Sequence, residues 1–450
     1  MIPPSSAALS DSPSGGRHRK LKPLNRTVRR TLVAVVLTPV AGAVMAGQSA
    51  FAADQSAASR ESVNRLDPAE QKLVDNLNAR AQDKNIGTTF SGVVLDAESD
   101  RVIWGHDAKT ALMPASNTKL ATATGALTLL GPDHRFTTNV VYGDGTLTLV
   151  GGGDRTLTTA DVAELAESAA AGLRSTGLDT VKVRIDDSLF PEPTLAEGWN
   201  SSYYDDQIAP VRSLVVDGKL VQDTAIDAGK VFAKQLAGQG IGVTGEVTRG
   251  QAASTDFPVA AHQSAELSVI VKQMLKTSNN DTAETLLRMT GLASGRKATY
   301  EGGTAAVRDV LTGWYGVSLA NFEIHDGSGL SRANRISAQT VAEILDLTTD
   351  PRHSDILKSL TDGLPVAGEA GSTLGPEWGR FDTANSECAV GQVKAKTGTL
   401  TGAIALSGIT QGKDGRWKVF SFIENNSTAD SGAIKDSLDG LAATVNGCWA

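Results

Sequence analysis

A serine and a lysine stand three residues apart at the start of an apolar stretch, PASNTKLATATGALTLL (114–130). On a helix, residues at this spacing lie on one face within side-chain reach, so Ser116 and Lys119 can act as a nucleophile and its base. The lysine can accept a proton only if its pKa falls well below about 10.4, and burial and a second cation both lower it. A serine at a helix start also lies beside free backbone N–H groups, which stabilise developing negative charge.

The S-x-x-K pair alone is a weak signal, because about one match is expected by chance in a chain of this length. A second match occupies residues 294–297, but that stretch is polar, contains glycine, and is not followed directly by an apolar helix. The first match has the better context, and an ordinary polar helix entry is its alternative interpretation.

Two further motifs favour the catalytic interpretation over an ordinary helix entry. Residues 278–280, in TSNN, form an S-x-N triplet, and residues 396–398, in AKTGTL, form K-T-G. Each alone is also consistent with a loop or an edge strand, and residues 62–64 match S-x-N by chance. The three motifs in this order, at a helix start, a helix-to-helix loop and a strand, are far more specific.

These motifs resemble those of the penicillin-recognising serine enzymes. Within that group, the chain resembles the D-alanyl-D-alanine carboxypeptidase/endopeptidase family of class C low-molecular-mass penicillin-binding proteins (peptidase family S13). The resemblance runs from about residue 88 to the C-terminus and is carried by PASNTKLATATGAL, LTLVGGGDRTLT, RIDDSLF, SNNDTAETLLR, HDGSGLSRANRIS and KAKTGTLTGAIALSG. It implies an exported serine peptidase that hydrolyses D-Ala-D-Ala or D-Ala-diamino acid bonds of peptidoglycan stem peptides and binds β-lactams covalently.

The resemblance also implies roles for the residues of the first two motifs. Ser116 attacks the substrate carbonyl and forms an acyl-enzyme that water hydrolyses, while Lys119 takes the serine proton. Ser278 relays a proton to the leaving D-alanine, and Asn280 holds Lys119 and a substrate amide.

The K-T-G motif is expected to supply the rest of the site. By the same resemblance, Lys396 adds positive potential that keeps Lys119 neutral and attracts the terminal carboxylate of the substrate. Thr397, Gly398 and Thr399 form the substrate-binding strand, whose two hydroxyl groups bind that carboxylate. The backbone N–H groups of Ser116 and Thr399 form the oxyanion hole, which is commonly a large catalytic contribution.

The elements that carry these motifs predict an α+β fold. A helix is expected at 67–82 and a hairpin at 90–107. Strand-like stretches at 392–411 and 416–425 predict a second hairpin, which precedes a final helix at 429–447. The two hairpins are expected to join one antiparallel sheet that is covered by helices, as in a penicillin-binding transpeptidase-like domain.

A change in the sequence pattern between the first two motifs predicts an inserted domain. From about residue 136, β-rich runs alternate with amphipathic helices, which indicates an α/β module at 136–262. Residues 67–135 and 263–450 then form the catalytic domain. The resemblance implies the same plan, but the interval is shorter than is usual in the family, so the insertion is either one module or two.

The N-terminus predicts export. A basic stretch at 17–30, an apolar stretch at 31–47 and the small residues of AFAADQ follow the order of a secretory signal cleaved near Ala52. An uncleaved membrane anchor is the alternative, and both the Sec and the twin-arginine route are open. Residues 53–66 are expected to be flexible, and the mature chain is expected at the cell-wall side of a bacterium without a stable membrane span.

Composition and absent motifs disfavour other functions. The formal charge of -8 argues against a nucleic-acid partner. The chain contains no G-x-S-x-G and no H-E-x-x-H, which argues against a Ser-His-Asp hydrolase and a zinc peptidase, and no metal or cofactor is expected. A serine β-lactamase and a non-catalytic cell-wall binding protein with the same fold are the alternatives, although the E-x-x-L-N string of class A β-lactamases is absent.

Three remaining features are assigned less sharply. In an exported protein, Cys388 and Cys448 are expected to form a disulfide, and two buried thiols are the alternative. The stretch HDGSGLS (325–331) is either a border of the active site or a structural loop, so it is left out of the predicted site. The aromatic residues of WNSSYYDD (199–206) are interpreted as core and interface packing residues, and contact with glycan or peptide is the alternative.

Overall fold

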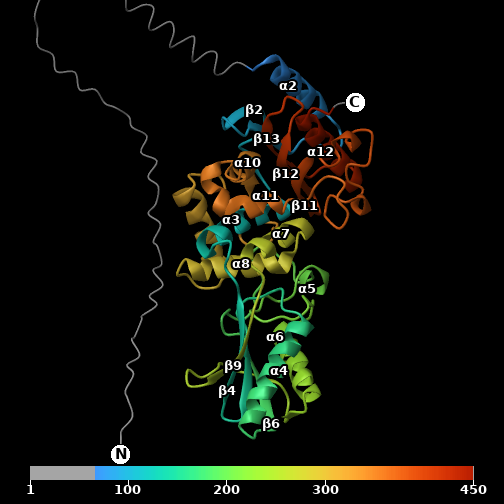
Figure 1. Ribbon diagram of the computed structural model, residues 1–450. Coiled ribbons are helices and arrows are strands. Elements are labelled where there is room, and N and C mark those ends of the chain that lie inside the picture. The colour runs from blue at the N-terminus through green and yellow to red at the C-terminus, as the bar shows by residue number, and fades with distance from the viewer. Residues whose placement is uncertain (1–65, 449–450) are drawn as a thin grey trace, which may run out of the picture. The chain divides into compact units, whose positions relative to one another are not determined.

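The computed structural model describes residues 66–448 (Figure 1). The predicted signal at 1–52 and nearly all of the predicted flexible segment lie outside the described residues. Across 66–448, no helix combines the length and the apolar character that crossing a bilayer requires.

One antiparallel sheet is assembled from the two ends of the described chain. Its strand order is β11-β12-β13-β1-β2, and β1 pairs with β13 so that Val94 lies opposite Phe420. This arrangement confirms the predicted sheet built from an early and a late hairpin. Its strands are β1 (Phe90–Asp96), β2 (Arg101–His106), β11 (Val393–Leu400), β12 (Ala403–Gln411) and β13 (Trp417–Asn425).

The late hairpin differs from the prediction. The stretch 392–411 was expected to be a single strand, but it contains β11 and β12, which are joined by a tight turn at Thr401 and Gly402. Gly402 has φ +76°, a left-handed conformation that glycine adopts readily. Because the apolar residues continue on both sides of this turn, the hydrophobic pattern does not reveal it. As a result, the K-T-G motif lies on β11, which forms an edge of the sheet.

Helices cover both faces of this sheet. Alternate strand residues point to opposite faces and so belong to two different hydrophobic cores. Phe422 belongs to a core shared with α2 and α12 on one face, whereas its neighbour Ile423 belongs to a core shared with α3, α7, α8, α10 and α11 on the other. Figure 1 shows α12 beside β12 and β13, and α2 packs against α12 and β2. The helices are α2 (Pro68–Arg80), α3 (Thr118–Leu130), α7 (Leu267–Thr277), α8 (Asn280–Ala293), α9 (Tyr300–Asp309), α10 (Ala338–Asp346), α11 (Ser354–Asp362) and α12 (Ser431–Asn446).

Short elements connect these helices and strands. A two-stranded ladder joins the segment just before Ser116 to the start of α10. The short elements are β3 (Ala111–Leu112), β10 (Ile336–Ser337), the 3-10 turns η1 (Ala115–Asn117), η3 (Pro351–His353), η4 (Pro376–Trp378) and η5 (Glu387–Ala389), and the π-helical turn η2 (Val310–Trp314).

A second, mixed sheet lies between the first two motifs in sequence. Its main order is β7-β6-β5-β4-β9, with β8 also paired to β6. β6 runs parallel to β5, β7 and β8, whereas β4 is antiparallel to both neighbours, and α4 and α6 supply a separate core. The elements are β4 (Thr137–Gly143), β5 (Thr146–Val150), α4 (Thr159–Ser175), β6 (Thr180–Asp186), α5 (Tyr203–Asp206), α6 (Thr224–Gly238), β7 (Gly242–Val243), β8 (Thr248–Arg249) and β9 (Phe257–Gln263).

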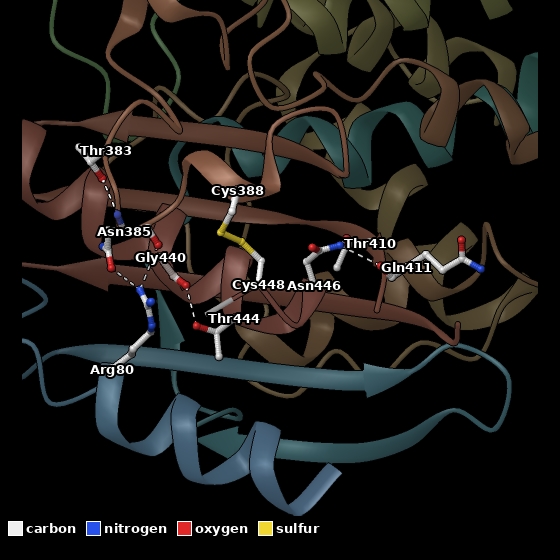
Figure 2. Close-up of a disulfide and its surroundings, with 10 residues drawn as sticks. All are labelled: Arg80, Thr383, Asn385, Cys388, Thr410, Gln411, Gly440, Thr444, Asn446 and Cys448. Carbon is white, nitrogen blue, oxygen red and sulfur yellow. Dashed lines mark hydrogen bonds between the residues drawn. A yellow bond between two sulfur atoms is a disulfide. The ribbon is translucent and has the colours of Figure 1, made fainter. Parts of the chain in front are cut away.

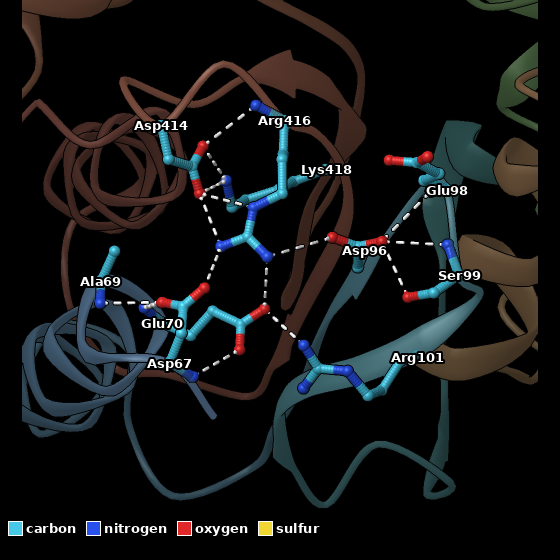
Figure 3. Close-up of polar contacts among 10 residues, drawn as sticks. All are labelled: Asp67, Ala69, Glu70, Asp96, Glu98, Ser99, Arg101, Asp414, Arg416 and Lys418. Carbon is cyan, nitrogen blue, oxygen red and sulfur yellow. Dashed lines mark hydrogen bonds and ion pairs between the residues drawn. The ribbon is translucent and has the colours of Figure 1, made fainter. Parts of the chain in front are cut away.

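An ion-pair network fastens α2 to the first sheet (Figure 3). The side chain of Asp67 accepts hydrogen bonds from the first turn of α2, and the side chain of Glu70 accepts one from the Asp67 N–H, which forms a capping box. Glu70 is only 1% exposed and contacts both Arg101 and Arg416. The network therefore joins the helix start to β2 and to the β12–β13 turn.

A disulfide fastens the other end of the chain (Figure 2). It joins Cys388, in η5, to Cys448, which follows α12, across a sequence separation of 60 residues. Beside it, the Asn446 amide donates to Thr410 Oγ1 at 3.0 Å and to the carbonyl of Gln411 at 2.9 Å. The end of α12 is thus held against β12.

Candidate active site

Ser116 lies in a strained and crowded turn. Ala115, the residue before it, has φ +47°, which is costly for a residue with a Cβ. Gly329 packs against the Ala115 carbonyl, and a Cβ at Gly398 would lie only 2.7 Å from the carbonyl oxygen of Pro114. The turn that carries the serine is therefore enclosed by the 325–331 loop on one side and by the K-T-G strand on the other.

Lys119 points from the first turn of α3 to Ser116. Its side chain is fully buried, and Nζ lies 3.0 Å from Ser116 Oγ, 2.8 Å from Asn280 Oδ1 and 2.7 Å from the Ser328 carbonyl oxygen. A neutral amine can donate its two hydrogens to the amide and carbonyl oxygens and still direct its lone pair at the serine hydroxyl. The geometry therefore suits proton removal from Ser116.

Burial lowers the pKa of Lys119 to about 8. Three carboxyl groups, those of Asp326, Glu284 and Asp281, oppose this shift because a nearby negative charge favours the ammonium form. The lysine is thus held much closer to neutrality than a solvent-exposed lysine.

Lys396 lies on β11 and is also fully buried. Its Nζ donates to Ser278 Oγ at 2.9 Å and to the Thr397 carbonyl at 2.8 Å. Burial lowers its pKa well below the ordinary value, and the charges of Lys119 and Arg380 lower it further. The two buried lysines repel each other when both are charged. The state in which only one of them is an ammonium group is therefore favoured over the state in which both are.

The S-x-N residues lie at the junction of α7 and α8. Ser278 ends α7 in a left-handed conformation with φ +59° and ψ +37°, and Asn279 caps α8 by accepting from the Thr282 N–H at 2.8 Å. Asn280 is the first residue of α8, and its amide nitrogen donates to the Gln207 carbonyl at 3.0 Å. The amide carries two hydrogens, so one stays available for a ligand.

The two threonines of β11 differ in their surroundings. Thr397 is largely buried, and its hydroxyl donates to Thr373 Oγ1 at 2.7 Å. Thr399 is exposed and pairs in register with Ile404. Thr373, which the sequence interpretation did not identify, therefore belongs to the surroundings of the K-T-G strand.

The structure thus gathers the three motifs into two linked groups. Ser116, Lys119 and Asn280 form one hydrogen-bonded group, and Ser278 and Lys396 form the other. The junction of α7 and α8 joins the two groups, as does the close approach of Gly398 to the Ser116 turn. The disulfide between Cys388 and Cys448, and the hydrogen bonds of Asn446 beside it, involve no residue of these two groups.

Sequence interpretation missed three residues behind Lys119: Ser328, Asp326 and Glu284. The first two lie in the HDGSGLS loop that was left out of the predicted site. Glu284 follows Asn280 by four positions on α8, a spacing that places both side chains on the same helix face and was available in the sequence.

The segment between the first two motifs also reaches the site. The Trp199 indole N–H donates to Asp326 Oδ2 at 2.8 Å, so this residue does more than pack. Asp281, next to Asn280, accepts from the Ala209 N–H at 3.1 Å and forms a buried ion pair with Arg155 at 2.8 Å.

Within residues 66–448, no group of three or more His, Cys, Asp or Glu side chains is arranged to hold a metal ion. The site as described consists of a serine, two lysines and their hydrogen-bonding neighbours.

Comparison with known proteins identifies the family. The model of the D-Ala-D-Ala carboxypeptidase 3 (S13) family matches residues 73–222 and 218–445. The chain belongs to this family. It is 32% identical to Carboxypeptidase DacB of Mycolicibacterium smegmatis over 85% of each chain, and 29% identical to the D-alanyl-D-alanine carboxypeptidase of an Actinomadura species over 91% of this chain and 89% of that one.

Solved structures agree with the fold. Penicillin binding protein 4 (dacB) from Haemophilus influenzae superposes with a TM-score of 0.68 at 22% identity, and the match covers 81% of this chain and 97% of that chain. A predatory endopeptidase from Bdellovibrio bacteriovorus, solved as its penicillin G acylated form in complex with an immunity protein, gives a TM-score of 0.51 at 19% identity, covering 80% and 93%. The expected transpeptidase-like α+β fold is thereby confirmed.

Proposed function

We propose that this member of the S13 family is an exported serine DD-peptidase whose acyl-enzyme forms on Ser116. Its substrates are peptidoglycan stem peptides in which a D-Ala carbonyl is joined to D-alanine or to a diamino acid, and the leaving group is that D-alanine or that diamino acid. β-Lactams acylate the same hydroxyl. Residues 136–262 form the inserted module of the proposed domain plan, and the mature chain acts on the cell-wall side of a bacterium.

The observation that carries this proposal is the contact between Lys119 Nζ and Ser116 Oγ at 3.0 Å. A serine hydroxyl is a weak nucleophile unless a base takes its proton, and a buried lysine with a pKa of about 8 is a competent base near neutral pH. The Asn280 side-chain oxygen and the Ser328 carbonyl accept the two hydrogens of the neutral Lys119 amine. The lone pair of the amine is thereby oriented toward the serine.

In the proposed reaction, Ser116 attacks the carbonyl of the D-Ala-D-Ala bond as its proton passes to Lys119. The N–H groups of Ser116 and Thr399 stabilise the oxyanion. Ser278, held by Lys396 at 2.9 Å, relays a proton to the leaving amine. Water then attacks the acyl-enzyme and restores the serine.

The positive charge of the site serves substrate binding. The terminal carboxylate is drawn toward Lys396 and is bound along β11 by the hydroxyl groups of Thr399 and Thr397, the latter exchanging its hydrogen bond to Thr373 for one to the carboxylate. The free hydrogen of the Asn280 amide binds a carbonyl of the substrate backbone. The exposed position of Thr399 and the edge position of β11 support an extended peptide lying beside this strand.

Mass spectrometry after incubation with penicillin tests the proposal. We expect a covalent adduct on the tryptic peptide 110–119, its loss in Ser116→Ala, and its retention in Ser294→Ala, the matched control from the second S-x-x-K sequence. A D-Ala-D-Ala peptide should yield free D-alanine with the wild type and with Ser294→Ala only. An adduct that survives in Ser116→Ala, or a wild type that is never acylated, would overturn the assignment. Rapid penicillin turnover without D-alanine release would indicate a β-lactamase instead.

A further inference from the structure

Glu284 is a fully buried acid directly behind the proposed base. Its carboxyl group accepts hydrogen bonds from the backbone N–H groups of Gly327, at 3.0 Å, and Ser328, at 2.7 Å. Within the described part of the chain, no lysine or arginine forms a salt bridge with it. A buried carboxyl group in such surroundings is costly as an anion, so its presence calls for a physical account.

Ser328 connects this acid to Lys119. The Ser328 N–H donates to Glu284, and its hydroxyl donates to Asp326 Oδ2 at 3.3 Å. Its carbonyl oxygen accepts a hydrogen bond from Lys119 Nζ at 2.7 Å. All three of its polar groups are therefore committed. The position of the carbonyl that orients the base depends on both buried acids.

The two acids are not equivalent. Asp326 accepts hydrogen bonds from the backbone N–H groups of Gly329 and Ser331 and from the side chains of Asn334 and Trp199. Glu284 has its pKa raised to about 8, first by burial and then by the negative charge of Asp326. Glu284 therefore takes up a proton near neutral pH.

We propose that Glu284 is a positioning residue for the base: it holds Ser328 so that the carbonyl orients Lys119, and by becoming neutral it lets the lysine become neutral. This inference rests on the proposed function, because it assumes that Lys119 deprotonates Ser116. When Glu284 is ionised, its charge favours the ammonium form, which cannot accept the serine proton. When Glu284 is protonated, this opposition disappears.

The charges around the two groups come from several elements. Lys119 and Glu284 are influenced by groups on the 325–331 loop, α8, α9, β11 and the segment around Trp199. These groups are Asp326, Asp281, Tyr300, Lys396 and Tyr204, and Arg288 in turn acts on the two tyrosines. Only Glu284 and Asp326 also bind the Ser328 residue that contacts the lysine.

The test is the pH dependence of acylation by a fluorescent penicillin in the full chain. Glu284→Gln removes the charge while keeping the size of the side chain, so we expect the acid-side midpoint of the rate to move to lower pH by about one unit. Glu284→Asp keeps the charge but shortens the reach to Ser328, so we expect a lower rate with the wild-type midpoint. Glu70→Gln is the matched control, because Glu70 is equally buried and its contacts lie in the network of Figure 3.

The outcomes separate this inference from the proposed function. A Glu284→Gln rate that falls equally at every pH, with an unchanged midpoint, overturns it even if Ser116 is acylated normally. A midpoint that moves equally in Glu70→Gln overturns it as well. A wild type that is not acylated at Ser116 overturns both the proposed function and the proposed role of Glu284. If Glu284→Gln does not fold, Glu284→Asp decides, because a wild-type rate in that variant would show that the length of the acid does not position the base.

Discussion

The buried ion pair between Arg155 and Asp281 offers a sharp test of how the segment between the first two motifs supports the site. The side chains are 4% and 10% exposed and lie 2.8 Å apart. Asp281 directly follows Asn280, which contacts the proposed base. Arg155→Met keeps much of the side-chain volume but leaves the carboxylate without its cation.

The expected loss is large. Removing one partner of a buried pair costs about 3–5 kcal/mol, because the other charge remains buried without compensation. With an unfolding entropy of about 2.1 cal/mol/K per residue, the ~380 residues that the structure describes contribute ~0.8 kcal/mol/K, so Tm should fall by ~4–6 °C. Acylation should slow as well, because the start of α8 is then less well fixed.

The pH dependence of this loss has a definite sign. Burial already raises the pKa of Asp281, and Arg155 opposes that rise. Without the arginine, the pKa of the folded state rises further above that of the unfolded state. The folded protein then holds a proton that the unfolded chain releases, so the destabilisation is full above the folded pKa and shrinks as the pH falls through it.

Thermal unfolding near neutral pH and near pH 5 checks these expectations, together with acylation rates. Arg296→Met is the control, because Arg296 and Asp309 are 37% and 63% exposed and such a pair contributes only about 0–1 kcal/mol. A second control is Asp281→Asn added to Arg155→Met, which should recover part of the loss, since no carboxylate is left unpaired. If Arg155→Met melts within a degree of the Arg296 variant, the buried pair does not hold the site and the reasoning fails.

Two further substitutions test the packing around the site and the chain end. Gly398→Ala would place a Cβ 2.7 Å from the Pro114 carbonyl oxygen, so the rate of penicillin acylation should fall by about 10- to 100-fold, whereas Gly238→Ala, which meets no atom within 4 Å, should leave it unchanged. Cys388→Ser opens a 60-residue loop and should lower stability by about 4 kcal/mol, seen as a lower Tm that reductant no longer changes, while acylation at permissive temperature persists.

Much of the fold follows from local sequence signals. The start of α2 follows from Asp67, whose side chain accepts from the first-turn N–H groups, from Pro68, which has no N–H to satisfy, and from Glu70, whose side chain accepts from the Asp67 N–H. The join between β1 and β13 follows from two hairpins that each need a partner for an apolar face. The turn at Gly402 was missed because one glycine in a continuous apolar stretch does not distinguish a tight turn from a close backbone approach.

The motif residues were identifiable because their chemistry depends on residue type and order. The remaining contacts depend on tertiary structure that no spacing encodes. The Gln207 carbonyl that binds Asn280 is a backbone group, and any residue type can supply it. Thr373 binds Thr397 across a separation of 24 residues, and the loop between them has no regular pattern that predicts this contact. Which positions surround a motif is therefore decided by folding, even when the motif itself is plain in the sequence.

The net charge of the buried cluster explains why acids lie behind a base that must be neutral. Two buried ammonium groups, Lys119 and Lys396, would be prohibitively costly without nearby negative charge. Full ionisation of Asp326 and Glu284 balances them, but it also favours the ammonium form of Lys119. Protonation of Glu284 together with deprotonation of Lys119 leaves the total charge unchanged, so the neutral base becomes accessible without exposing an unbalanced charge to the interior. Replacing either acid by an apolar residue would therefore remove more than a hydrogen bond, because one carboxyl group fewer would be left to balance the two lysines.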